Sequence, residues 1–156
     1  MQAVTNVNGI ITSDITWTKA NSPYNLTGNV AIDKGVTLTI ELRVAVNLNN
    51  YYIRVNGTLT ARGSSNDKIY FNGGEIVFTP SSTGWNEQTE VGSIIENAII
   101  NATLQLGTTS PMVNNNTIMK SIYVGGGSPI ISKNTKLLSH FQIGLGVLVI
   151  SQLSSV

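Results

Sequence analysis

Carboxylate side chains are the first candidates for chemistry, and they are few and unevenly placed. All eight acids lie at or before Glu96, so the C-terminal part of the chain has none. Hydrolysis of a glycosidic bond needs two positioned carboxyl groups, about 5 to 9 Å apart. Glu87 and Glu90 are the best candidates, because they follow Trp85 in the segment TPSSTGWNEQTEVG, which is long enough to form a loop. We expect both to be surface-loop carboxylates, and we therefore predict no catalytic residue.

Nucleophiles and metal ligands are equally scarce. The chain has no cysteine and a single histidine, His140. Thiol nucleophiles, thiolate metal sites and an imidazole cluster within one chain are therefore excluded. The glycines 125–127 are not followed by Gly-Lys-Ser/Thr, so we interpret them as a turn and not as a phosphate loop. We predict no metal site and no cofactor, and we leave enzymatic activity open while favouring a non-catalytic protein.

The charge pattern bears on partners and location. Only 11% of residues are charged, with eight acids against nine lysines and arginines. No broad electrostatic field favours nucleic acid or an anionic membrane. The first residues, MQAVTNVNGIITSD, contain no basic region and no long apolar run, so no signal peptide is visible. No segment reaches the roughly 18 apolar residues of a membrane span.

The remaining composition favours strands over helices. Asparagine, glycine, threonine, serine, valine and isoleucine dominate the chain. The polar members compete for backbone hydrogen bonds within a helix, and the β-branched members lose side-chain freedom there. Apolar residues alternate with polar ones in VTLTI (36–40), VAVNL (44–48) and YIRV (52–55). These segments are predicted to be short strands with one buried face.

A sequence repeat organises these strands. Residues 94–95, 112–113 and 130–131 match at steps of about 18 residues, as do residues 104–107 and 122–125. Upstream, the period lengthens to about 21 to 23 residues, and 38–40 matches 59–61 while 53–55 matches 76–78. Such a period predicts a solenoid of five or six coils. We interpret Asn114, Asn115 and Asn116 as turn residues. We do not interpret them as a cation site, because three amides without a carboxylate bind a cation poorly.

Three stretches carry a resemblance to a known family. GNVAIDKGVTLTIE, VNGTLTARGSSNDKIYF and SPIISKNT resemble coils of right-handed parallel β-helix proteins of the pectate-lyase-like superfamily, especially its repeat-bearing surface proteins and carbohydrate-binding variants. The resemblance implies an all-β fold, a single-stranded right-handed parallel β-helix, at the cell surface or outside the cell. The chain departs from the pattern where Leu42-Arg43 replaces a Pro-Gly turn after Glu41, and where Lys136 occupies an apolar position.

Under this prediction the chain is a single domain over residues 1–156. Residues 1–27 form an N-terminal cap closed by the segment around Trp17 and Tyr24, residues 28–135 form the coils, and residues 136–156 form a degenerate last coil. The C-terminal sequence FQIGLGVLVISQLSSV has no charged residue. Because the last coil of a β-helix exposes unpaired strand edges, we predict end-to-end self-association through this coil.

A binding surface is predicted from the aligned strands. In the third strand of each coil one outward position is taken in turn by Arg54, Val77, Gln105, Tyr123 and Gln142. Amide, phenol and guanidinium groups can bond sugar hydroxyls, and a polysaccharide or cell-surface glycan is the partner that the resemblance implies. The predicted ligand-binding residues are Arg54, Gln105, Tyr123, Gln142 and Trp85, and the alternative is a solvated sheet face without a ligand.

Three functional hypotheses follow, in order of preference. The first is a structural or adhesive surface module, and the second is a carbohydrate-binding module. The third is a degenerate or incomplete polysaccharide lyase or glycoside hydrolase.

Overall fold

A computed structural model of the protein describes residues 3–136, 141–143, 149–150 and 153–155, with side chains as far as Lys136. The strands form two sheets in which every pair of neighbouring strands is parallel. The ten-stranded sheet contains β1 (Thr5–Ile11), β3 (Tyr24–Ile32), β5 (Ala45–Val55), β7 (Ile69–Phe78), β9 (Ala98–Gly107), β11 (Thr117–Ile118), β12 (Ile122–Val124), β14 (Asn134–Lys136), β15 (Phe141–Ile143) and β17 (Leu153–Ser155).

The seven-stranded sheet lies opposite, and a short 3-10 helix, η1 (Lys19–Asn21), connects its first strand to the ten-stranded sheet. Its strands are β2 (Ile15–Trp17), β4 (Thr37–Ile40), β6 (Thr58–Arg62), β8 (Ile94–Glu96), β10 (Met112–Asn114), β13 (Ile130–Ser132) and β16 (Val149–Ile150). Within the described ranges, no helix is long and apolar enough to cross a bilayer.

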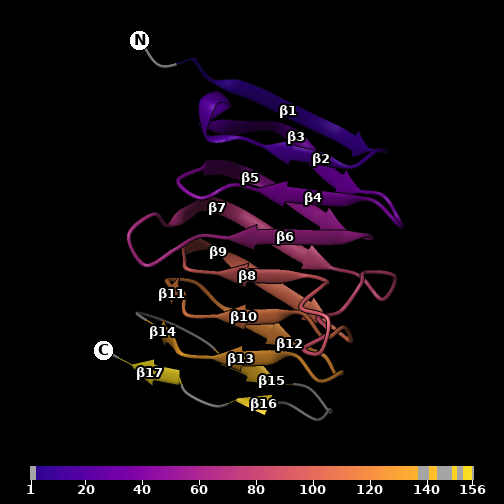
Figure 1. Ribbon diagram of the computed structural model, residues 1–156, viewed down its shortest axis with the longest axis vertical. Helices are drawn as coiled ribbons and strands as arrows, with labels where there is room; N and C mark the ends of the chain where they lie inside the picture. The colour runs from indigo at the N-terminus through magenta and orange to yellow at the C-terminus, as the bar shows by residue number, and fades with distance from the viewer. Residues whose placement is uncertain (1–2, 137–140, 144–148, 151–152, 156) are drawn as a thin grey trace.

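The backbone winds as a β-solenoid of about six turns, with 58% of residues in strands and 2% in helix. In Figure 1 strands of the seven-stranded sheet such as β4, β6 and β8 run leftwards in front, strands of the ten-stranded sheet such as β5, β7 and β9 run rightwards behind, and the coils descend from the N-terminus. This sense of winding is right-handed. The prediction of an all-β parallel β-helix of five or six coils is therefore confirmed.

The register between coils follows the sequence repeat. Ile94 and Ile95 pair with Met112 and Val113, which pair in turn with Ile130 and Ile131. The longer upstream period is confirmed in the same way, because residues 38–40 pair with 59–61 and residues 53–55 pair with 76–78. One step is irregular: Val124 pairs with Gly107 instead of Leu106 because β9 and β12 shift register there.

The core is a stack of inward-facing side chains between the two sheets. One row of paired positions in the ten-stranded sheet contains Tyr24, Val46, Phe71, Ile100 and Ile118, all buried. Each fully buried apolar side chain of this size stabilises the fold by about 1.5 to 3 kcal/mol relative to exposure. The row continues to Lys136, which pairs with Ile118, is buried, and donates from Nζ to the Lys120 carbonyl at 2.8 Å. The position of Lys136, where an apolar residue was expected, is therefore a core position. Burial removes water from the Lys136 amine and lowers its pKa.

Asparagines shape the corner that follows β8 and β10. Asn97 and Asn115 adopt left-handed backbone conformations with φ of 52° and 56°, and Lys133 does so in the next coil with φ of 54°. Asparagine tolerates this region better than most residues. Asn116 and Asn134 are buried beside these residues and bond the backbone of neighbouring coils. Asn115 and Asn116 are therefore turn residues, as predicted, whereas Asn114 is the last residue of β10 and not part of the turn.

The N-terminal end is formed by strands that lie within the segment expected to be a cap. Trp17 and Tyr24 are buried and stack with ring centroids 4.7 Å apart, and the Tyr24 hydroxyl accepts a hydrogen bond from the Thr18 N–H at 2.9 Å. The outermost described strand is β1, which pairs with β3 on one side. At the other end, Val147 and Leu148 lie outside the described residues, so self-association through the last coil stays a prediction.

Candidate functional site

The predicted binding row lies on the outer face of the ten-stranded sheet. Arg54 pairs with Val77, Val77 with Gln105, Gln105 with Tyr123, and Tyr123 with Gln142. The alignment on which the row depends is therefore confirmed. Arg54 is exposed, and Gln105 and Tyr123 are half-buried. The side chain of Gln142 is outside the described part of the structure.

The polar groups of this row are interrupted. Arg54 lies over the ring of Tyr52, with 5.2 Å between its Cζ atom and the ring centroid. Val77 occupies the next position and separates Arg54 from Gln105. The row therefore offers two separate polar patches on a sheet face, and its role in binding stays a prediction.

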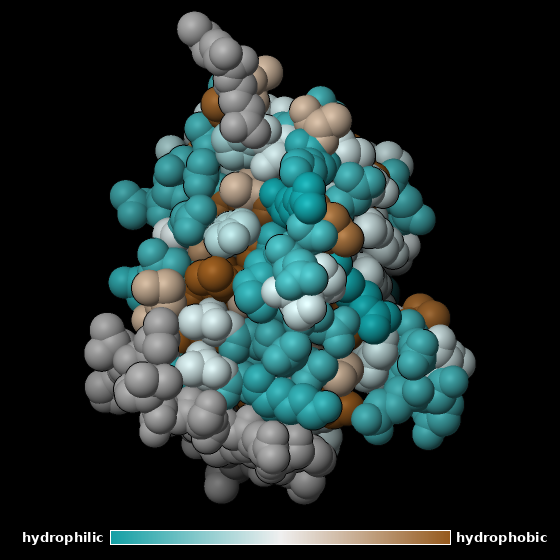
Figure 2. Space-filling model, turned by 60° about the vertical axis from the view of Figure 1, so that its left-hand side comes forward, coloured by the Kyte–Doolittle hydropathy of each residue, from teal (hydrophilic) through white to brown (hydrophobic). Residues whose placement is uncertain are grey.

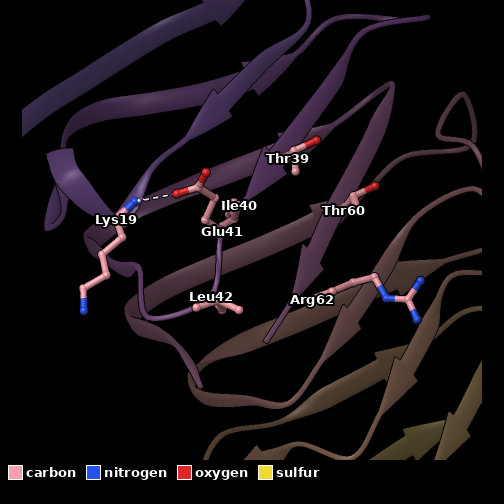
Figure 3. A pocket seen from close by; sticks show the side chains of 7 residues that line it. All are labelled: Lys19, Thr39, Ile40, Glu41, Leu42, Thr60 and Arg62. Carbon is pink, nitrogen blue, oxygen red and sulfur yellow. Dashed lines mark hydrogen bonds between the residues drawn. The ribbon is translucent and has the colours of Figure 1, made fainter. Parts of the chain in front are cut away.

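A groove lies instead on the other sheet, at the ends of β4 and β6. Its volume is about 470 Å³, within the range of about 300 to 1,000 Å³ that is usual for ligand pockets. Two neighbouring strands, the turn after β4 and the short helix η1 supply its walls (Figure 3). The lining residues are Lys19, Thr39, Ile40, Glu41, Leu42, Thr60 and Arg62.

Strand alternation explains the outward threonines of this groove. Leu38 and Leu59 point into the core and are fully buried, so their neighbours Thr39 and Thr60 point outwards. Thr39 and Thr60 are paired across the two strands. In Figure 3 their side chains project from adjacent strands, and Leu42 and Arg62 lie nearer the turns. Two hydroxyls therefore stand side by side at the spacing of the coils, about 4.8 Å.

The apolar part of the groove comes from the turn after β4. Arg43, in this turn, has a left-handed φ of 66°. The turn is held because the Arg43 N–H donates to the Lys68 carbonyl at 3.2 Å and the Arg43 side chain pairs with Asp67. Leu42, next to it, is 42% exposed. Figure 2 shows apolar side chains in a hollow among polar ones on this side of the molecule, where the coils turn between the sheets.

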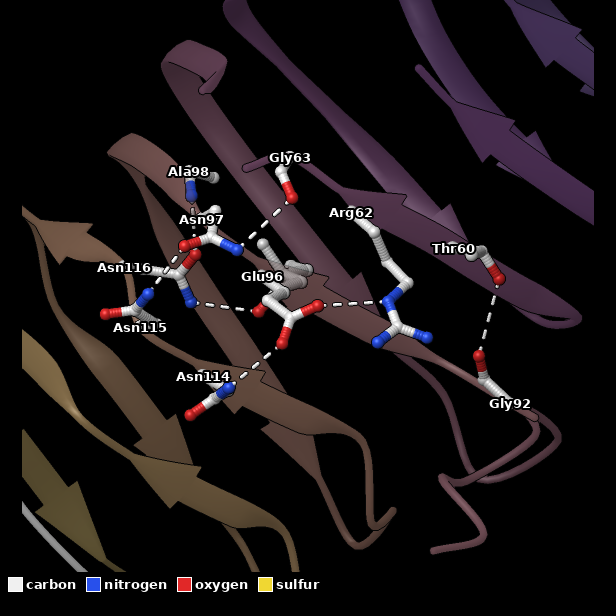
Figure 4. Close-up of polar contacts among 11 residues, drawn as sticks. Thr60, Arg62, Gly63, Gly92, Glu96, Asn97, Ala98, Asn114, Asn115 and Asn116 are labelled. Atoms are coloured by element: carbon white, nitrogen blue, oxygen red, sulfur yellow. Dashed lines mark hydrogen bonds and ion pairs between the residues drawn. The ribbon is translucent and has the colours of Figure 1, made fainter. Parts of the chain in front are cut away.

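Acidic and basic groups of the groove are held in place by hydrogen bonds. Glu41 accepts from the Lys19 N–H at 2.9 Å, which ties η1 to the turn after β4 (Figure 3). Arg62 donates from Nε to Glu96 at 3.0 Å, and Glu96 also accepts from Asn114 Nδ2 at 3.0 Å (Figure 4). The guanidinium at the groove edge is therefore oriented by a carboxylate from the next coil.

Trp85 lies beside this guanidinium. The Arg62 Cζ atom is 5.5 Å from the Trp85 ring centroid, a cation–π distance. The structure thus brings Trp85 next to Arg62, which lines the groove on the seven-stranded sheet, although Trp85 is not itself a lining residue. Arg54, Gln105, Tyr123 and Gln142 belong to the ten-stranded sheet. Trp85 and the other predicted ligand-binding residues therefore do not form one site.

The loop that contains Trp85, residues 79–93, is anchored to coils on both sides. The Thr83 N–H donates to Gly57 and the Trp85 N–H donates to Ser110, each at 2.9 Å. By register Ile94 faces outwards with Thr60, yet it is fully buried. Outward-facing residues are buried only where another segment covers them, and this loop is the segment that precedes Ile94. The end of the loop therefore lies next to Thr60, whose hydroxyl donates to the Gly92 carbonyl at 3.4 Å (Figure 4).

Four carboxylates bear on the earlier expectations. Glu87 and Glu90 are exposed in the loop, and Glu41 and Glu96 are engaged as described above. Across the described ranges no three His, Cys, Asp or Glu side chains gather where they could hold a metal ion.

Sequence reasoning missed the groove because its walls come from separate coils. Lys19 and Glu41 are 22 residues apart, and Arg62 and Glu96 are 34 apart. One signal was present: TLT occurs at equivalent positions of two aligned strands, 37–39 and 58–60, which places threonines side by side.

Comparison with known proteins finds no matching family model, no similar curated protein and no similar solved structure.

Proposed function

We propose that this protein is a non-catalytic β-helix module of the cell surface or the extracellular space that binds a polysaccharide or cell-surface glycan in the groove beside Trp85. The observation that carries the proposal is the combination found there: exposed Leu42, the hydroxyls of Thr39 and Thr60, and a guanidinium stacked near an indole. The resemblance of the coils to carbohydrate-binding β-helix proteins of the pectate-lyase-like superfamily supports it.

The chemistry of a sugar ring fits these groups. A pyranose has apolar C–H faces that pack on aromatic and aliphatic side chains, and a rim of hydroxyls that both donate and accept hydrogen bonds. Threonine hydroxyls donate and accept, a guanidinium donates, and a carboxylate accepts. Arg62 is already oriented by Glu96, so little side-chain entropy is lost when it binds a hydroxyl.

The placement of the acids supports a role without catalysis. Glycosidases hold two carboxyl groups on opposite sides of the scissile bond. In the groove, Glu41 accepts a backbone hydrogen bond, and Glu96 is shared between Arg62 and Asn114. Both carboxylates therefore serve to fix neighbouring elements.

A glycan array, followed by affinity electrophoresis in gels that contain the polysaccharides found, tests the proposal. We expect Trp85→Ala and Leu42→Asp each to weaken binding by about tenfold, the effect of removing an apolar anchor from an interface. The matched controls are Tyr51→Ala and Val91→Asp, at positions that are 37% and 64% exposed and do not line the groove. Circular dichroism checks that each variant folds.

Two outcomes would contradict the proposal, one by locating the ligand on the ten-stranded sheet and the other by excluding carbohydrate binding. Loss of binding on Arg54→Ala or Tyr123→Ala, with Trp85→Ala and Leu42→Asp unaffected, would place the ligand on the ten-stranded sheet and contradict the groove. Absence of binding to every neutral and acidic polysaccharide on the array would contradict a carbohydrate-binding role and favour a structural or adhesive one.

A further inference from the structure

Three asparagines of the sequence are followed by glycine: Asn8, Asn56 and Asn72. In such a pair the backbone nitrogen of the glycine can attack Cγ of the asparagine, because glycine has no Cβ to obstruct the approach. A new bond between this nitrogen and Cγ closes a succinimide ring, the bond between Cγ and Nδ2 breaks, and ammonia leaves. Water then opens the ring and gives aspartate or isoaspartate. The net reaction exchanges an amide and water for a carboxylic acid and ammonia.

The reaction requires the backbone to rotate, so the fold decides which pair can react. Asn8 lies in β1, which pairs with a neighbour on one side. The register between β1 and β3 shifts between Val7 and Gly9, so Asn8 is not paired with a residue of β3 in the backbone ladder. Gly9 has a left-handed φ of 86°, and a side chain built on it would meet no atom within 4 Å. Asn8 itself is exposed, and its side-chain amide donates to the hydroxyl of Thr27, also exposed.

The pair at Asn56 is enclosed. The Asn56 N–H donates to the Ile32 carbonyl, and its Oδ1 accepts from the Thr79 hydroxyl at 2.9 Å. Gly57 is buried, and an added Cβ would lie 2.2 Å from the Val36 carbonyl oxygen. Rotation of this backbone therefore requires the opening of neighbouring coils.

The pair at Asn72 is held within the sheet. Asn72 pairs with Asn47 on one side and with Asn101 on the other. Its Nδ2 donates to Asn47 Oδ1 at 3.1 Å, and an added Cβ on Gly73 would lie 2.6 Å from the Asn49 carbonyl oxygen. Although its side chain is exposed, its backbone belongs to an interior strand.

We propose that Asn8 is a site of spontaneous deamidation in the folded protein, and that the fold protects Asn56 and Asn72. Water is the only co-reactant. The product has a carboxylate where the native protein is neutral, and isoaspartate adds a methylene to the backbone of the outermost strand. Asn8 lines an end cavity of about 280 Å³ together with apolar residues that include Val7, Ile11 and Trp17. Deamidation therefore places a negative charge on the rim of this cavity.

Peptide mapping by mass spectrometry after timed incubation of the intact protein in mildly alkaline buffer tests the proposal. Isoaspartate is distinguished from aspartate by its carboxyl methylation. We expect Asn8 to deamidate at least about tenfold faster than Asn56 and Asn72, because reaction at the latter two requires local unfolding of paired strands. In concentrated urea, we expect the three sites to react at similar rates.

The variant Asn8→Gln is the matched control, because glutamine would have to close a larger ring. It should abolish the early deamidated species while leaving the circular dichroism spectrum unchanged. Equal rates at the three sites in the folded protein would overturn the proposal. Faster reaction of Asn8 in urea as well would also overturn it, because the preference would then come from local sequence and not from the fold.

Discussion

The buried asparagine Asn116 permits a quantitative prediction about what holds the coils together. Its side chain is 2% exposed. The Oδ1 atom accepts a hydrogen bond from the Ala98 N–H at 2.9 Å, and Nδ2 donates to the Ile95 carbonyl at 2.9 Å (Figure 4). Asn134 repeats this pattern one coil later, with bonds from the Asn116 N–H and to the Val113 carbonyl. Each amide therefore bonds one N–H and one carbonyl on the two sides of the corner in the preceding coil.

Replacement of Asn116 by alanine removes the partners of one buried N–H and one buried carbonyl. A buried polar group left without a partner costs about 1 to 3 kcal/mol. The two groups together predict a loss of about 2 to 6 kcal/mol in the free energy of unfolding. For a protein of this length, each kcal/mol lowers the melting temperature by about 2 to 4 °C. We therefore expect the melting temperature to fall by roughly 10 °C.

Urea unfolding followed by circular dichroism measures this loss. The control is Asn50→Ala, because Asn50 is an exposed residue of β5, and such surface changes usually stay within about 0.5 kcal/mol. A loss below about 1 kcal/mol for Asn116→Ala, with an unchanged dependence on urea concentration, would refute the reasoning. It would mean that water satisfies the two backbone groups as well as the amide does.

Three further predictions concern single residues. Lys136→Met should stabilise the protein at neutral pH, because burial lowers the pKa of Lys136 and the charged amine opposes folding. The difference in free energy of unfolding between Lys136→Met and the unmodified protein should shrink as the pH rises from the folded-state pKa of Lys136 toward the ordinary lysine pKa. In this pH range the unfolded state binds more protons than the folded state, so a rise in pH stabilises the unmodified protein. Urea titrations at several pH values measure this difference. Lys133→Asn should stabilise by about 0.5 to 1 kcal/mol, because Lys133 has a φ of 54° where the preceding coils have asparagine; an unchanged or lower melting temperature would contradict this. Glu87→Gln and Glu90→Gln should leave the melting temperature and any glycan binding unchanged, and loss of a polysaccharide-cleaving activity in either variant would contradict a non-catalytic loop.

The order of strands and their register could be read from the sequence. Coils of nearly constant length stack so that equivalent residues become neighbours, and a slip by one residue would turn apolar side chains such as Ile95 and Val113 towards water. The offset of about 18 residues therefore predicted the pairs between β8, β10 and β13. The same argument placed Arg54, Val77, Gln105 and Tyr123 in one row.

The tertiary structure decided everything that depends on where coils turn and how loops fold back. The groove forms where η1 is tied to Glu41 and Leu42 stays exposed in the turn after β4, and the loop before Ile94 brings Trp85 to Arg62 beside it. The three Asn-Gly pairs look alike in the sequence, and only their different strand environments distinguish them. A periodic pattern determines the contacts between equivalent positions of successive coils. Contacts between non-equivalent positions depend on the path of each turn, which local sequence constrains weakly.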